Sequence, residues 1–213
     1  MKTVVVTGAS RGLGLALANE FSSNDWSVIG IGRSVRPEEL DSSIRYEQFD
    51  GANAEACEDF WKSLPSEQTS GEICLVNNAG GYAGGGLLES KPEDFEKQMR
   101  SNYFSAVYMT RGLATVVPKA RIVNIISENA LAAKSTDPAY GASKAAEMYF
   151  FKTLQKEFKP DKYQITNLYP SSIATSGPNS KAIDPGDLAR YVLQLADSEK
   201  TYYIADATLR PAA

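Results

Sequence analysis

The residues most suited to chemistry in this sequence are a tyrosine and a lysine four positions apart, Tyr140 and Lys144. On a helix this spacing places both side chains on one face, about 5–6 Å apart at Cβ. A nearby ammonium group favours the phenolate form of tyrosine, which lets the phenol exchange a proton near neutral pH. The pair therefore predicts acid–base chemistry, although the same spacing also arises by chance in many helices.

The absence of histidine excludes several other kinds of site. The chain has 213 residues with no His and two Cys, which rules out a Ser-His-Asp triad and histidine-ligated metals, and we predict no metal site. Its net charge of −4 argues against a nucleic-acid partner. No apolar stretch could span a bilayer, and the apolar run at 4–6 is too short for the core of a secretory leader, so we expect none. We expect a cytoplasmic protein with no membrane contact.

A glycine-rich segment, TGASRGLG at 7–14, lies between a β-branched run and a helical pattern. Gly8 permits a sharp exit from the strand, Gly12 lets the backbone approach a phosphate, and Gly14 allows close packing of helix on sheet. The start of the helix offers N–H groups and partial positive charge to a dinucleotide pyrophosphate. Such glycines can be purely structural, but their place favours a cofactor site formed by Gly8, Ser10, Arg11, Gly12, Leu13 and Gly14.

The form of the cofactor follows from the end of the second expected strand. An acidic residue there commonly binds the ribose 2′-hydroxyl of NAD, but this chain has Arg33 and Ser34, with Arg11 in the glycine turn. Guanidinium groups and a hydroxyl would attract a 2′-phosphate. We therefore predict NADP(H); the alternative is that both arginines are surface charges. Asp50, after the third expected strand, could accept a hydrogen bond from the adenine amino group.

Segments with strand and helix patterns alternate along the chain. We expect strands at 3–7, 27–32, 44–49, 73–76, 121–126, 163–169 and 202–204, and helices at 12–22, 53–64, 92–117, 138–158 and 184–196. Between 33 and 44 there is room only for a short crossover. This alternation predicts one doubly wound α/β domain over 1–213, a Rossmann-type parallel sheet with helices on both faces. Its carboxyl edge would gather the glycine turn, Asn77–Gly80, Ser127 and Pro170.

With these elements in place, the chain resembles a classical short-chain dehydrogenase/reductase along nearly its whole length. Five motifs occur in the order of that family: TGxxxGxG at 7–14, NNAG at 77–80, Asn102, Ser127 ahead of Tyr140 and Lys144, and Thr175 five residues beyond Pro170.

The resemblance implies a role for each matching residue. Tyr140 would exchange a proton with the substrate oxygen, Lys144 would favour the phenolate and bind the nicotinamide ribose, and Ser127 would hydrogen-bond the substrate oxygen. Asn102 would hold a water of a proton relay. Further cofactor contacts are implied for Asn78, Ala79, Gly80, Pro170, Ile173 and Thr175.

The implied activity is hydride transfer between NADPH and a small carbonyl or alcohol substrate, in a homodimer or homotetramer. Two alternatives stay open. One is reduction of a 3-oxoacyl group on a carrier protein, which would call for basic residues at the mouth, where the expected lid offers only Lys181. The other is an NADP(H)-binding regulator without turnover, although such a protein would be expected to lose Tyr140 or Lys144.

Three features depart from the family pattern and leave the substrate undecided. Ser171 follows Pro170 where the family usually has Gly, and the expected lid at 176–183 is short. Five of the 16 glycines lie between Gly80 and Gly86, around Tyr82. This pliable run carries one aromatic residue near the expected site, and we interpret it either as a mobile wall or as a loose loop.

Overall fold

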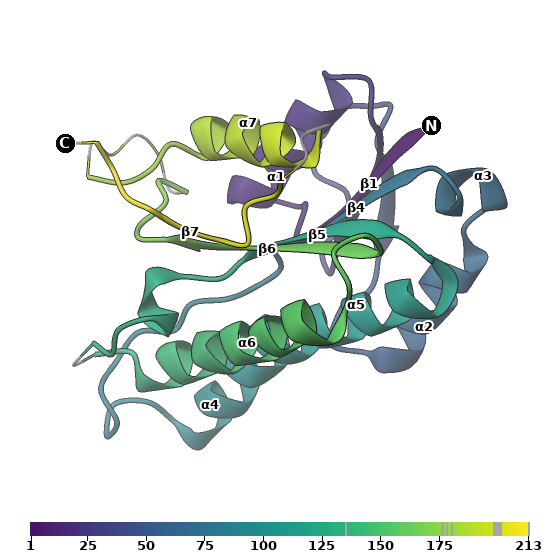
Figure 1. The fold of residues 1–213 in the computed structure, drawn as a ribbon. Coiled ribbons are helices and arrows are strands. Elements are labelled where there is room, and N and C mark those ends of the chain that lie inside the picture. The colour runs from purple at the N-terminus through teal and green to yellow at the C-terminus, as the bar shows by residue number, and fades with distance from the viewer. Residues whose placement is uncertain (135, 176, 178, 180, 198–201, 213) are drawn as a thin grey trace.

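The structure is a computed structural model that describes residues 1–134, 136–175, 177, 179, 181–197 and 202–212. These residues contain one sheet of seven strands in the order β3-β2-β1-β4-β5-β6-β7 (Figure 1). Every neighbouring pair is parallel. The predicted doubly wound α/β fold is therefore confirmed.

The strands lie close to their expected positions, with one exception. Their bounds are β1 Lys2–Thr7, β2 Ser27–Gly32, β3 Arg45–Gln48, β4 Glu72–Asn77, β5 Ala120–Ile125, β6 Tyr163–Pro170 and β7 Asp206–Leu209. The expected edge strand at 202–204 is wrong. Pairing with β6 begins only where the N–H of Asn167 donates to the carbonyl of Ala205, 2.8 Å away. The Tyr169 hydroxyl donates to Asp206 at 2.7 Å, which helps to place β7 after the apolar run.

The helices also follow the sequence pattern, and the long central one differs in detail. They are α1 Gly12–Ser22, α2 Ala54–Ser63, α3 Ser66–Thr69, α4 Pro92–Gln98, α5 Ser105–Val116, α6 Pro138–Glu157 and α7 Pro185–Ala196, with a 3₁₀ turn η2 at Glu128–Ala130. The single helix expected at 92–117 instead contains a π-helical segment, η1 Met99–Phe104, between α4 and α5. A π-helical turn takes more residues than an α-helical turn, so it shifts the helix face and is often found at functional sites.

The connection from β2 to β3 is the short crossover that the sequence predicts. Residues 33–44, all of which the structure describes, contain no helix, and the Arg36 side chain fixes their path instead. The guanidinium group donates to the carbonyl oxygens of Ile44 at 2.7 Å and Leu40 at 3.0 Å.

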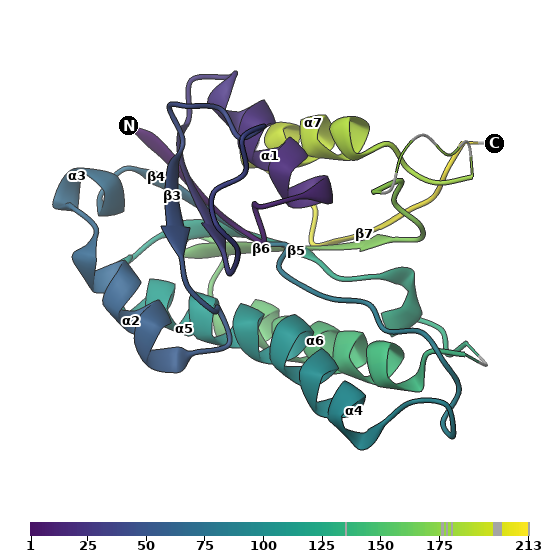
Figure 2. The same cartoon turned by 180° about the vertical axis from the view of Figure 1, so that it is seen from behind.

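Two apolar layers cover the faces of the sheet. Successive residues of β1 alternate between them: Val4 and Val6 face α1 and α7, whereas Val5 faces the layer of α2, α5 and α6. All three valines are fully buried. Figures 1 and 2 show α1 and α7 on one side of the sheet and α2, α4, α5 and α6 on the other. A sheet covered on both faces leaves its strand ends as the place for a ligand.

Buried asparagines tie the central strands together near that edge. Asn77, Asn124 and Asn167 lie opposite one another on β4, β5 and β6. The Asn77 amide donates to Asn124 and the Asn124 amide donates to Asn167, each at 2.9 Å. Because these polar groups are buried, their mutual hydrogen bonds disfavour any slip in strand register.

Candidate functional site

The glycine turn between β1 and α1 has the backbone geometry that the sequence predicts. Gly8 and Gly12 adopt left-handed φ values of 70° and 56°. A side chain at Gly14 would place Cβ 2.0 Å from the carbonyl oxygen of Gly8, so only glycine lets the helix lie this close to the turn. Gly12 also lies against Thr175, whose methyl carbon would be 3.2 Å from a Cβ at position 12. The turn and Thr175 are thus brought together.

The NNAG segment after β4 is fastened directly to this turn. The Thr7 hydroxyl accepts hydrogen bonds from the N–H groups of Asn78 at 3.0 Å and Ala79 at 2.9 Å. In return, the Asn78 amide donates to the Thr7 carbonyl at 2.9 Å. Asn78, Ala79 and Gly80 therefore stand beside the first turn, as the resemblance requires.

The start of α1 fits the phosphates of a dinucleotide. Arg11 occupies the N-cap with no side-chain hydrogen bond to the helix, so the first N–H groups, including that of Leu13, are not capped by a side chain. The side chains of Arg11 and Arg33 are exposed and have no hydrogen-bond or ion-pair partner within the described part of the chain. The glycine turn has no room for a Cβ at Gly14, and these two cations follow the ends of β1 and β2. This combination suits a phosphorylated cofactor.

The other adenosine-side residues lie on the surface at the ends of β2 and β3. Ser34 is exposed, and its carbonyl accepts a hydrogen bond from the Tyr46 hydroxyl at 2.9 Å. Asp50 accepts from the N–H of Ala52 at 3.0 Å and lies 3.9 Å from Arg100. The adenine contact of Asp50 stays a prediction.

Asn102 lies in the π-helical segment and is fully buried. Its carbonyl oxygen accepts from the N–H of Gly81 at 2.7 Å, and its amide donates to the Gly81 carbonyl at 3.1 Å and the Ser143 hydroxyl at 2.8 Å. The side chain therefore fastens the glycine-rich loop to α6. The water relay expected for Asn102 stays a prediction.

Ser127 and Tyr140 come from the end of β5 and the first turn of α6. Ser127 is 4% exposed, and its hydroxyl oxygen accepts from the N–H of Asn129 at 3.2 Å. Pro138 occupies the first turn of α6, a position where a missing N–H costs no hydrogen bond. Among the described residues, none hydrogen-bonds the half-buried Tyr140 hydroxyl. That hydroxyl is available to a substrate oxygen.

Lys144 lies one turn further along α6 and reaches toward β5. Its ammonium group donates to the carbonyl of Ile125 at 2.9 Å, two residues before Ser127. It also donates to the Glu147 carboxylate at 2.7 Å. These bonds connect the lysine to the strand that carries Ser127, so the serine, the tyrosine and the lysine lie on two directly connected elements.

Tyr82 holds the glycine-rich loop, residues 80–86, against Tyr140. The rings of Tyr82 and Tyr140 meet edge to face with centroids 5.2 Å apart, and the Tyr82 hydroxyl donates to Asp137 at 2.8 Å. Gly84 faces the same phenol, because a Cβ there would lie 2.9 Å from the Tyr82 oxygen. Asp137 adopts a left-handed φ of 74° just before α6, and its N–H donates to the Gly85 carbonyl. These contacts tie the loop to the start of α6, while the Tyr82 side chain stays 66% exposed. A role of the loop in a substrate site stays a prediction.

The segment beyond β6 completes the edge. Ser171, in the place of the usual glycine, continues the pairing with β7 through its N–H, which donates to Leu209 at 3.0 Å. Ile173 forms a bridge with Ile183, and the N–H of Thr175 donates to the carbonyl of Ile173 at 2.9 Å. Positions 176, 178 and 180 of the expected lid lie outside the described residues.

Two features were not found from the sequence. One is Glu147, which contacts Lys144 directly. The sequence signal that could have indicated it is a carboxylate three residues after the lysine, on the buried face of the same helix. The other is Tyr82, which in the sequence stands out only as an aromatic residue in a glycine run. Its contact with Asp137 joins positions 55 residues apart, for which the sequence holds no local signal.

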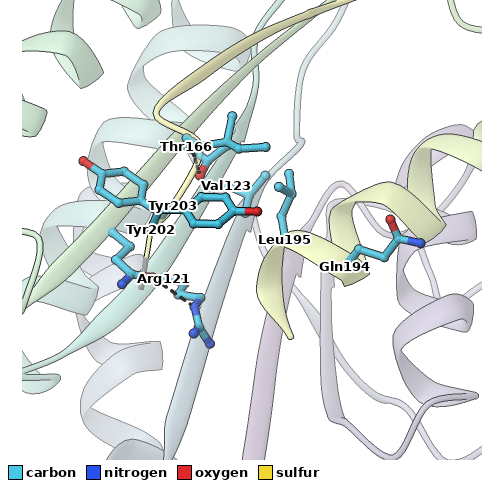
Figure 3. Close-up of a pocket in the computed structure, with 9 residues that line it drawn as sticks. Arg121, Val123, Thr166, Gln194, Leu195, Tyr202 and Tyr203 are labelled. Atoms are coloured by element: carbon cyan, nitrogen blue, oxygen red, sulfur yellow. Dashed lines mark hydrogen bonds between the residues drawn. The ribbon is translucent and has the colours of Figure 1, made fainter. Parts of the chain in front are cut away.

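A separate hollow lies at the opposite edge of the sheet. Its lining residues come from the amino-terminal parts of β5 and β6, from α7, and from the segment before β7; they are Arg121, Val123, Gln164, Thr166, Gln194, Leu195, Tyr202, Tyr203 and Ile204 (Figure 3). None of the expected site residues lines it.

The described residues lack two other kinds of site. They contain no group of three or more acidic or cysteine side chains that could hold a metal ion. None of the described helices combines the length and apolar character needed to cross a bilayer.

Comparison with known proteins bears on the family of the chain and on its fold. Residues 2–184 match the family model described as short chain dehydrogenase. The chain is 31% identical over 199 residues to the NADP-dependent 3-hydroxy acid dehydrogenase of Salmonella typhi, across 84% of this chain and 79% of that protein. It is 27% identical to the 3-oxoacyl-[acyl-carrier-protein] reductase of Haemophilus influenzae, across 98% and 95%. The crystal structure of serine dehydrogenase from Escherichia coli superposes with a TM-score of 0.87 at 27% identity, across 98% and 97%.

Proposed function

Because the chain belongs to the short-chain dehydrogenase family of oxidoreductases, we propose that it transfers hydride between NADP(H) and a small carbonyl or alcohol substrate. The observation that carries this proposal is the Tyr140 hydroxyl. It has no hydrogen-bond partner among the described residues, and it lies one helical turn from a buried lysine that is bound to the strand leading to Ser127.

Each side chain would have a distinct task in carbonyl reduction. Bound NADPH would supply the hydride to the carbonyl carbon. Tyr140 would donate its proton to the oxygen as negative charge develops there, and the Ser127 hydroxyl would hydrogen-bond the same oxygen. Lys144 would stabilise the phenolate left on Tyr140. In alcohol oxidation the same groups act in reverse, and Tyr140 accepts the proton.

The preference for NADP(H) rests on charge at the end of β2. Arg11 and Arg33 are exposed cations without partners among the described residues, and residues 33–37, directly after β2, include no carboxylate that could bind a free 2′-hydroxyl. A planar guanidinium group binds phosphate through two parallel hydrogen bonds. A relative that is NADP-dependent by name agrees with this reading.

The direct test is oxidation of NADPH by the purified protein with a panel of carbonyl compounds. We expect turnover with at least one compound, and a loss of about 10²-fold or more in Tyr140→Phe, which keeps the ring but lacks the proton. Tyr149→Phe, which removes a hydroxyl from an exposed residue on the same helix, is the matched control. Full activity in Tyr140→Phe would show that another group donates the proton.

The cofactor assignment is tested separately by binding. We expect tighter binding of NADPH than of NADH in the wild type, and Arg33→Ala should weaken NADPH binding about tenfold while changing NADH binding little. Lys62→Ala, on the outer surface of α2, controls for the loss of one positive charge. Equal affinities of the wild type for both cofactors would contradict the assignment.

Two alternatives have outcomes of their own in these assays. The similarity to a 3-oxoacyl-carrier reductase makes acyl thioesters a necessary part of the substrate panel. Selective turnover of carrier-linked substrates would mean that the substrates are 3-oxoacyl groups on a carrier protein rather than small ketones. Tight NADPH binding without turnover of any compound would instead indicate a regulator.

We also propose a homodimer or homotetramer. Tyr149 is 74% exposed on the long helix α6, and the partly exposed rings of Tyr103, Phe104 and Phe150 pack on one another between η1 and α6. Several accessible aromatic side chains on neighbouring helices are typical of a surface that a second copy covers. Light scattering coupled to gel filtration would measure the mass, and a mass near the chain's own 23.1 kDa would contradict this assembly.

A further inference from the structure

Glu147 is a buried carboxylate in direct contact with the lysine of the site. Its Oε2 lies 2.7 Å from the ammonium nitrogen of Lys144, and the two side chains are 1% and 5% exposed. Burying a carboxylate is costly unless it is paired, so its place beside this lysine calls for an explanation. The hydride-transfer roles assigned above make no use of it.

Tyr140, Lys144 and Glu147 form one stripe along α6, the helix labelled in Figure 1. Their spacings of four and three residues place them on the same helix face, with about 10 Å of helix between the first and the last. Lys144 therefore stands between the phenol and the carboxylate.

The hydrogen bonds of Lys144 leave it one free donor. An ammonium group has three N–H bonds. One is directed to the carbonyl of Ile125 and one to Glu147, at 2.9 and 2.7 Å. The third remains for a cofactor hydroxyl, so Glu147 limits the positions that the nitrogen can occupy.

The neighbouring elements offer little other charge to compensate Glu147. On β6, burial raises the pKa of Tyr169, which keeps this phenol neutral, and its hydroxyl donates to Asp206 on β7. Asp206 is in turn paired with Lys152, at 3.3 Å. Among the described residues, Lys144 is the cation that forms an ion pair with Glu147.

We propose that Glu147 is a positioning residue of the reaction: it holds the Lys144 ammonium group and offsets part of its charge, so that Tyr140 keeps its proton to higher pH. A protonated Tyr140 is the form that reduces a carbonyl. The carboxylate thus extends carbonyl reduction toward alkaline pH at the expense of alcohol oxidation. This inference rests on the proposed function of Tyr140 and Lys144.

The ionisation of Glu147 itself is consistent with such a role. Burial raises the pKa of its carboxyl group to about 7, and the ion pair with Lys144 opposes that rise. The carboxylate is then the main form above about pH 7. Below pH 7 the wild type and a neutral variant should converge.

The first test compares pH profiles of carbonyl reduction. Reduction needs protonated Tyr140, so kcat/KM falls as pH rises through a midpoint. Glu147→Gln removes the negative charge and favours the phenolate, so the midpoint should move down by about half a unit to one unit. Glu157→Gln makes the same change of net charge at an exposed position of α6 and should leave the midpoint in place. Glu147→Asp, which restores the charge, should return it toward the wild-type value.

The second test does not depend on turnover. In protein labelled with ¹³C at tyrosine Cζ, the resonance lost in Tyr140→Phe reports the ionisation of Tyr140 in the free protein. We expect its titration midpoint to fall in Glu147→Gln and not in Glu157→Gln. Should Glu147→Gln fail to fold, Glu147→Met, which fills similar space without charge, is the substitute.

The outcomes separate this inference from the proposed function. An unmoved tyrosine midpoint in Glu147→Gln or Glu147→Met, with turnover intact, would overturn the role of Glu147 and leave the reductase assignment standing. A shifted midpoint in a protein that turns over no carbonyl would support the charge coupling and overturn the proposed function.

Discussion

Replacing Asn102 with alanine would test whether the π-helical segment serves to hold the glycine-rich loop. The asparagine side chain is fully buried. It makes hydrogen bonds of 2.7 and 3.1 Å to the N–H and carbonyl of Gly81, and one of 2.8 Å to Ser143. Alanine at this position would remove all three.

The expected loss of stability follows from these three bonds. Each intramolecular hydrogen bond contributes about 1 kcal/mol net, and leaving buried partners without a bond adds to the loss. We expect the free energy of unfolding to fall by about 3 kcal/mol. For a chain of this length that corresponds to a Tm lower by roughly 6–12 °C. Activity should fall as well, because the released loop carries Tyr82 against Tyr140.

Urea unfolding at a fixed protein concentration, with linear extrapolation to water, would measure this change. Ser101→Ala is the matched control, because it lies in the same π-helical segment and its hydroxyl makes only a 3.4 Å contact with Gln98. We expect Ser101→Ala to stay within about 0.5 kcal/mol of the wild type. A change below about 1 kcal/mol in Asn102→Ala would refute the reasoning, because three buried hydrogen bonds cannot be lost at so small a cost.

Three further outcomes are expected. In Gly14→Ala the new Cβ would lie 2.0 Å from the carbonyl oxygen of Gly8. Calorimetry should therefore show a lower Tm, and titration should show a weaker affinity for NADPH. Wild-type values for both would mean that the turn can open to admit the side chain. Tyr82→Ala should raise KM for the carbonyl substrate several-fold, because the ring against Tyr140 is lost. Tyr82→Phe, which loses only the hydrogen bond to Asp137, should raise KM less. Unchanged KM values in both variants would show that Tyr82 does not contact the substrate. Finally, burial raises the pKa of Glu147 from 4.5 to about 7, so the folded protein binds this proton more tightly than the unfolded chain. The resulting stability is complete below pH 4.5 and is lost as pH rises through 7. Relative to Glu147→Gln, the wild type should lose about 2 to 3 kcal/mol of unfolding free energy between pH 5 and 8 in urea unfolding. Parallel stability curves would contradict this.

Local patterns were enough to place most of the fold. The helix at Gly12–Ser22 and the strand at Ser27–Gly32 have the bounds that the sequence predicts, because glycines and apolar periodicity mark their ends. The edge strand was misplaced because Tyr202–Ile204 is apolar enough for a strand. The pairing that selects Asp206–Leu209 depends on β6, some 40 residues earlier.

For the site, the sequence alone determined the residue types, their order and their arrival at one edge of a parallel sheet. These follow from motif spacing and from the rule that the carboxyl ends of parallel strands meet on one side. Only the tertiary structure decided which side chains neighbour the reacting groups: Glu147 beside Lys144, Tyr82 across Tyr140, and Asn102 on the glycine loop. The spacing of residues along one helix tells only which side chains share a face of that helix. A contact between elements depends on how tightly they pack and on the net cost of burying each polar group, and that cost is set by partners distant in the chain.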